Sequence, residues 1–207
     1  MPAEYGLWAS VGVILGYVRY ADLGMGYHLG KGLPRLLTED DGIAYTRKIG
    51  LGFTWSISVS VLITLGFTLA AICYKGADPE FYVYAFYALA AIGATQLIKS
   101  VGVHILNSRE EYALLSKQAM AVEILGVGLS LILIVEFGPL GLVASLLITE
   151  IITTIYVFVI LIKARYLKMV LNIEGLRSAI SSGMWLLFIG LLEMLLMTTD
   201  QIFIMSG

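Results

Sequence analysis

Residues 47–75 read RKIGLGFTWSISVSVLITLGFTLAAICYK, an apolar run (50–74) with basic side chains at both ends. A helix that crosses a bilayer needs roughly 20 mainly apolar residues, because each residue adds about 1.5 Å of rise. Five more stretches are long and apolar enough, at 6–24, 82–105, 118–137, 139–162 and 183–205. The sequence therefore predicts an all-α, polytopic membrane helix bundle of about six transmembrane helices.

The composition supports this interpretation over the whole chain. Of the 207 residues, 59% are apolar and 14% are charged, whereas soluble domains contain about 45–50% apolar and about 25% charged residues. We expect residues 1–207 to form a single transmembrane domain. Met1-Pro2-Ala3-Glu4 has no basic leader, and Gly207 directly follows an apolar run, so we expect the domain to be incomplete at both ends.

Basic residues fall in alternate gaps between the predicted spans. The gaps 25–49, 106–117 and 163–182 hold ten Lys and Arg residues, and the other gaps hold only Lys75. Loops that stay in the cytoplasm retain Lys and Arg. We therefore predict that the three basic gaps face the cytoplasm and that the first span runs from outside to inside.

Several classes of function find no support in the sequence. A basic stripe interleaved with aromatic residues is absent, so we expect no nucleic-acid partner. Cys73 is the only cysteine, and His28 and His104 are far apart, so we expect no metal site. The Gly30-Lys31 pair lacks the rest of a phosphate-binding loop. No nucleophile–base pair is evident, and we expect neither an enzyme nor a cofactor.

Ionisable residues within the spans are the main functional candidates. Each charge at the centre of a bilayer costs on the order of 3 kcal/mol, so these groups must face helices, water or one another. Arg19 and Asp22 lie three residues apart and can pair on one helix face. Two interpretations stay open, a polar cavity that carries an ion or charged headgroup and simple structural pairing. The ionisable residues within the spans are Arg19, Asp22, Lys99, Glu123, Glu150, Glu193 and Asp200.

Smaller patterns add local predictions. Gln96, Ser100 and His104 share one helix face, with Lys99 beside it. Small residues follow one another at four-residue spacing from Gly52 through Ser56 and Ser60, which indicates either helix packing or a cavity wall. Thr38 with Asp41 fits a capping box that starts a helix. The glycines of 24–32 predict a helix end and a close helix crossing.

Two elements near the start of the chain carry a family resemblance. Glu4-Tyr5-Gly6-Leu7-Trp8-Ala9 is similar to an "EYG-W" element, and Asp22-Leu23-Gly24-Met25-Gly26 is similar to a "DLG-G" element. Both are typical of polysaccharide and O-antigen flippases, a family of the multidrug/oligosaccharidyl-lipid/polysaccharide exporter superfamily. Gly138-Pro139-Leu140-Gly141 and Asp200-Gln201-Ile202 resemble the family more weakly.

The resemblance implies a fold and a function. The six spans would be the second to seventh helices of a family member, one lobe of a two-lobe, MATE-like transporter, with a partner chain supplying the missing lobe. The implied activity moves undecaprenyl-pyrophosphate-linked oligosaccharide or polysaccharide precursors from the cytoplasmic to the outer leaflet of a bacterial or archaeal plasma membrane. The candidates for substrate binding are Arg19, Asp22, Gln96, Lys99, Ser100 and His104, and those for ion coupling are Glu150, Glu193 and Asp200.

Two other functions remain open. The acidic residues Glu150 and Glu193 also suit a cation-coupled multidrug exporter of the same superfamily, because carboxylates bind cations and cationic drugs. A truncated membrane protein without transport activity is the third possibility.

Overall fold

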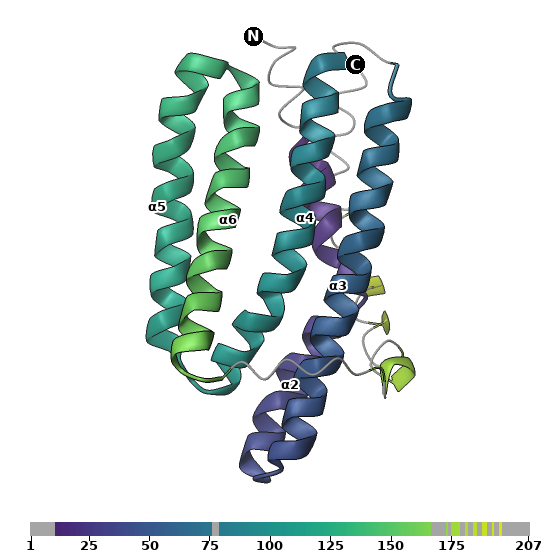
Figure 1. Cartoon of the computed structure of the whole chain (residues 1–207), viewed down its shortest axis with the longest axis vertical. Helices are drawn as coiled ribbons and strands as arrows, with labels where there is room; N and C mark the ends of the chain where they lie inside the picture. The colour runs from purple at the N-terminus through teal and green to yellow at the C-terminus, as the bar shows by residue number, and fades with distance from the viewer. Residues whose placement is uncertain are drawn as a thin grey trace.

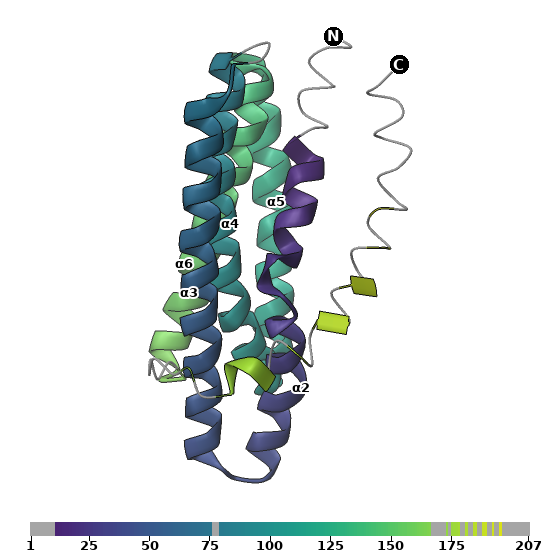
Figure 2. The same ribbon diagram turned by 90° about the vertical axis from the view of Figure 1, so that its right-hand side faces the viewer.

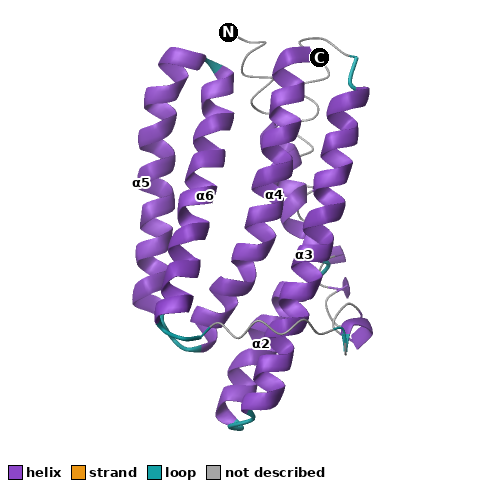
Figure 3. Ribbon diagram, in the orientation of Figure 1, coloured by secondary structure: helices purple, strands orange, loops and turns teal. Residues whose placement is uncertain are grey.

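The computed structural model describes residues 11–75 and 79–166, with scattered positions between 173 and 195. Within these residues the chain is helical and has no strand (Figure 3). Residues 11–18 form a first helix, which continues into the short 3₁₀ helix η1. The remaining elements follow in chain order, η1 (Arg19–Asp22), α2 (Met25–Thr38), α3 (Gly42–Cys73), α4 (Pro79–Ser108), α5 (Tyr112–Phe137) and α6 (Pro139–Lys163).

Four of the predicted membrane spans are confirmed as helices of the right length and composition. These are α3, α4, α5 and α6, which among the described residues are long and apolar enough to cross a membrane. The predicted first span, 6–24, is described only from residue 11 onward. The predicted sixth span, 183–205, lies outside the described residues except for scattered positions.

The first span does not run as one straight α-helix to its predicted end. The α-helix ends at residue 18, and η1 leads into Leu23 and Gly24, which both adopt left-handed backbone angles (φ 50° and 81°). Glycine adopts positive φ at no steric cost, so Gly24 permits the break, and α2 then begins at Met25. The predicted helix end is confirmed, but the following glycines lie inside a helix that the sequence analysis did not predict.

Helices α2 and α3 form a hairpin whose turn is set by a cap. The buried face of α2 carries Met25, Leu29 and Leu33, with polar residues on the other side. The Asp41 side chain accepts a hydrogen bond of 2.9 Å from the Ala44 backbone N–H and caps α3. The predicted capping box is therefore wrong by three residues, because Thr38 ends α2 and its hydroxyl donates to the Arg35 carbonyl.

Two apolar clusters hold the bundle together around α4. The ribbon views show the arrangement of the helices, with α4 between α3 and α6 (Figures 1 and 2). The larger cluster joins α2, α3, α4 and α6 and includes Leu29, Phe53 and Val101. The smaller one places Val11 of the first helix against Leu89 of α4 and Val143 of α6. Apolar packing thus ties α4 to every other described helix except α5, which touches it only lightly.

The row of small residues on α3 serves packing in its first half. Gly52 leaves space for Leu29 of α2, and Ser56 is buried. The Ser60 hydroxyl donates a hydrogen bond of 3.1 Å to the Ala94 carbonyl of α4. Small residues let helix backbones approach closely in lipid, and this part of the row meets that expectation.

Helices α5 and α6 pair side by side at the edge of the bundle (Figure 1). Gly138 turns the chain between them, and the Ser130 and Ser145 hydroxyls lie 2.7 Å apart across the pair. No residue of α5 is buried, and its exposed surface is mostly apolar, including Ile124, Leu131 and Val135, although Glu123 is exposed there as well. Such a surface is unstable in water but suits hydrocarbon, as expected of a membrane helix.

The described parts of the three basic gaps meet at one end of the bundle, which we call the basic end (Figure 1). Tyr45 of the first gap, Arg109 of the second and Tyr166 of the third line a single cavity there. The alternation of basic and non-basic gaps along the chain thus corresponds to a real difference between the two ends of the molecule.

Candidate functional site

A buried ion pair between α4 and α6 joins two of the predicted site residues. The Lys99 ammonium lies 2.7 Å from each oxygen of the Glu150 carboxylate, and both side chains are nearly nine-tenths buried. Lys99 also donates a hydrogen bond of 3.3 Å to the Thr153 hydroxyl. Glu150 is thirteen residues from Lys163, so the pair lies about 20 Å of helix rise from the end of α6. The pair therefore sits deep within the predicted hydrocarbon layer.

The polar atoms around this pair are incompletely satisfied. Among the described residues, the hydroxyls of Thr149 and Thr154 and one oxygen of Glu150 are buried without a hydrogen-bond partner. Lys99 donates its hydrogen bond to Oε2 of Glu150, and Oε1, although it accepts no hydrogen bond, lies just as close to the ammonium in the ion pair. A buried polar group without a partner costs free energy, so the Thr149 and Thr154 hydroxyls suit a further polar ligand beside the ion pair.

A second polar group forms where the first helix breaks. The Asp22 carboxylate accepts hydrogen bonds from the backbone N–H groups of Gly24 (3.0 Å) and Gly26 (2.9 Å). The Trp55 indole N–H of α3 donates to the Asp22 carbonyl at 2.7 Å. The imidazole of His104 on α4 lies close to the Asp22 carboxylate. Both groups border Gly26, where an added Cβ would come within 3.0 Å of each of them. The "DLG-G" element thus caps α2 and meets the polar face of α4.

For the other predicted site residues, the described part of the structure shows no contact that points to a function. Gln96 is half-buried, and the Ser100 hydroxyl donates to the Leu97 carbonyl of its own helix. Arg19 lies in η1, but its side chain is outside the described part of the structure, so its predicted pairing with Asp22 stays a prediction. Glu193 and Asp200 also lie outside the described residues.

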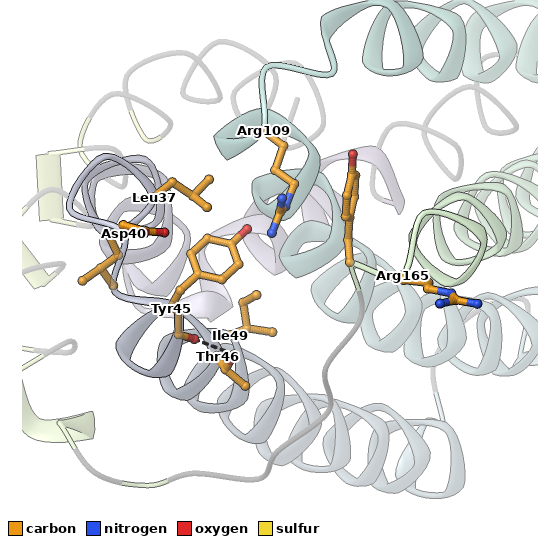
Figure 4. A pocket seen from close by; sticks show the side chains of 10 residues that line it. Leu37, Asp40, Tyr45, Thr46, Ile49, Arg109 and Arg165 are labelled. Atoms are coloured by element: carbon orange, nitrogen blue, oxygen red, sulfur yellow. Dashed lines mark hydrogen bonds between the residues drawn. The ribbon is translucent and has the colours of Figure 1, made fainter.

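A cavity of about 250 Å³ opens at the basic end (Figure 4). Its walls come from the α2–α3 hairpin, the α4–α5 turn and the chain that leaves α6. Figure 4 shows the Arg109 side chain pointing toward Tyr45. The lining residues are Leu36, Leu37, Asp40, Gly42, Tyr45, Thr46, Ile49, Arg109, Arg165 and Tyr166.

Arg109 joins three segments that are far apart in the sequence. Its guanidinium lies 4.3 Å from the ring centre of Tyr166 and 5.3 Å from that of Tyr45, within range of cation–π attraction. The Tyr45 and Ser108 hydroxyls are 3.0 Å apart, and the Tyr166 hydroxyl donates to the Glu111 carboxylate at 3.0 Å. This hydrogen bond to Glu111 raises the pKa of the Tyr166 phenol, because it favours the protonated form.

Sequence reasoning did not single out Tyr45, Arg109 and Tyr166 as a cluster. The sequence shows that each lies just outside an apolar span, but their meeting depends on how the α2–α3 hairpin packs beside the ends of α4 and α6. No group of three or more potential metal ligands occurs within the searched, described residues.

No family model, curated protein or solved structure matches this chain, so the resemblance to the flippase family rests on the sequence motifs themselves.

Proposed function

We propose that this membrane protein takes part in moving lipid-linked oligosaccharide or polysaccharide precursors from the cytoplasmic to the outer leaflet. The observation that supports this most is the set of polar contacts that α4 makes at membrane depth, where Lys99 pairs with Glu150 and His104 meets Asp22. Charged groups within a membrane are costly and commonly mark a transport pathway. Asp22 also belongs to the "DLG-G" element on which the family resemblance depends.

The chemistry of such a substrate fits the types of side chain present. A pyrophosphate needs cations, and Arg19 and Lys99 are the basic side chains within the predicted spans. Sugar hydroxyls need donors and acceptors such as Gln96 and Ser100. In this proposal Glu150 competes with the substrate phosphate for Lys99, and a proton taken up by Glu150 releases Lys99 to bind it. Glu193 and Asp200 remain further candidates for ion coupling.

The test measures glycan export in cells of the organism that encodes the chain. Lys99 and Glu150 are replaced together by glutamine, because a variant that removes only one of them leaves a buried charge. We expect the double variant to be inserted at normal levels and to lose export of the lipid-linked glycan. Lys163→Gln, at the exposed end of α6, is the matched control and keeps export. Normal export by the double variant would contradict the proposal.

A cation-coupled multidrug exporter is the second candidate. It is favoured by the buried carboxylate of Glu150, because an acidic group at membrane depth also suits a cation or a cationic drug. The same double variant separates the two functions. Lost drug resistance with unchanged glycan export would favour the multidrug exporter. If deletion of the whole chain changes neither property, the protein does not transport either substrate.

A further inference from the structure

A basic groove runs between α2 and α3 at the basic end of the bundle. It consists of two adjoining cavities of about 350 and 390 Å³, which share His28, Leu36, Lys48 and Ser178. Gly175 and Ser178, from the segment after α6, contribute to its walls. The groove is separate from the Arg109 cavity, with which it shares only Leu36.

The charge of the groove is strongly unbalanced. Lys31 and Arg35 line it from α2, and Arg47 and Lys48 line it from α3. Glu39 is the single acidic residue among the described lining residues, and it already forms an ion pair of 2.7 Å with Arg35. No ion pair or hydrogen bond involves Lys31 or Lys48 within the described residues. An anion would therefore neutralise the charges of Lys31 and Lys48, which the described protein groups leave uncompensated.

The end of the Lys48 side chain lies against α2, in space that Gly32 leaves open. This side chain is half-buried, and any Cβ at Gly32 would collide with the end of the lysine chain. His28 lies nearby, and its partial burial and then the charge of Lys48 lower the pKa of its imidazole. The other described charged or titratable groups near His28 are Lys31, Arg35 and Glu39 on α2, Arg47 on α3 and His104 on α4.

The groove lies at the depth of lipid headgroups. Helix α3 has 32 residues, about 48 Å of rise, whereas the hydrocarbon layer is about 30 Å thick and headgroups extend it to about 40–45 Å. Lys48 precedes the apolar run that begins at residue 50 by two residues. The groove also has an apolar side, formed by Leu36, Ala44 and Leu51, which suits the glycerol and first acyl carbons of a lipid.

We propose that this groove binds the phosphate of an anionic phospholipid headgroup in the cytoplasmic leaflet, with Lys48 as its central contact. Lysine binds phosphate as a compact point charge, and Arg47 and Lys31 enclose the site from both helices. The proposal does not depend on what the protein transports, because the described lining residues of the groove, apart from Leu51, lie outside the predicted spans.

The test uses the two histidines of the chain as reporters. The full chain, labelled at histidine, is placed in nanodiscs of phosphatidylcholine alone or with one third phosphatidylglycerol, and both imidazoles are titrated by NMR. We expect phosphatidylglycerol to raise the pKa of His28 by about half a unit or more, because a bound anion favours the protonated imidazole. His104, deeper in the bundle, should shift less. An unchanged His28 pKa would contradict the proposal.

Two variants separate a bound headgroup from the general potential of a charged membrane. Gly32→Ala displaces the Lys48 ammonium without changing net charge, and Lys48→Gln removes the charge. Both should lose most of the His28 shift, whereas Lys163→Gln, which removes one charge outside the groove, should keep it. Equal shifts in all four proteins would overturn the proposal.

Inorganic phosphate distinguishes the two sources of the anion. At tens of millimolar in phosphatidylcholine nanodiscs, it should produce a much smaller His28 shift than phosphatidylglycerol does. If phosphate alone reproduces the full shift, the groove is a site for a free anion and the assignment to a lipid headgroup is wrong.

Discussion

At the scale of single residues, the sequence identified the polar side chains within the spans but not their partners. Lys99 and Glu150 are 51 residues apart, and their pairing depends on α4 packing against α6. Asp22 was predicted to pair with Arg19, which stays a prediction, and the structure shows that its carboxylate also caps α2, a role that the spacing did not reveal. Local spacing predicts which residues share a helix face, whereas contacts between helices depend on packing that spacing does not contain.

The Lys99–Glu150 ion pair gives the first prediction. Lys99→Met leaves a buried carboxylate without its partner, and we expect the free energy of unfolding to fall by about 3 kcal/mol. Replacing both residues, as Lys99→Met with Glu150→Leu, should restore most of this loss. Unfolding in detergent micelles measures all three proteins, with Lys163→Met as a surface control. A double variant less stable than Lys99→Met would refute this account of the pair.

The cap on α2 gives the second prediction. Asp22→Ala removes the acceptor for the Gly24 and Gly26 N–H groups and should cost about 1 kcal/mol, typical of a lost helix cap. Asp22→Asn keeps one acceptor oxygen and should cost less. Amide hydrogen exchange at Gly24 and Gly26 should accelerate in the alanine variant. Unchanged exchange at both glycines would mean that Asp22 does not cap α2 in solution.

At the scale of elements, the long apolar helices were predictable and α2 was not. Apolar runs of about 20 residues predicted α3 to α6, because only a helix satisfies its own backbone hydrogen bonds in lipid. Helix α2 contains Gly26, Gly30, Gly32 and Pro34, which all disfavour helix by local propensity. It forms because its apolar face packs on α3 and α4, with glycines where His104 and Lys48 need space.

The α5–α6 pair gives a prediction at this scale. A Cβ at Gly141 would collide with the backbone carbonyl of Leu133, which cannot move aside as a side chain can. We expect Gly141→Ala to lower the free energy of unfolding by about 1–3 kcal/mol, as overpacking does. Gly128→Ala on α5 is the matched control, because a Cβ there meets nothing within 4 Å. Equal stability of the two variants would contradict the close approach of α5 and α6.

At the scale of the whole molecule, the distribution of charge and the arrangement of helices agree. The gaps with most Lys and Arg lie at one end of the bundle, and Arg109 with its two tyrosines joins all three of them. Cys73 ends α3 at the opposite end and is exposed. The sequence alone predicted that the basic gaps would lie at one end and the other gaps at the opposite end, since this depends only on the number of crossings and on which gaps hold Lys and Arg.

Cysteine labelling in intact cells tests the central claim that this chain crosses the membrane with its basic end inside. A membrane-impermeant maleimide should label the native Cys73 without permeabilisation. In a Cys73→Ser background, Ala113→Cys, an exposed neutral position beside the α4–α5 turn, should be labelled only after the membrane is permeabilised. Labelling of both cysteines from the same side of intact cells would contradict the membrane topology on which the rest depends.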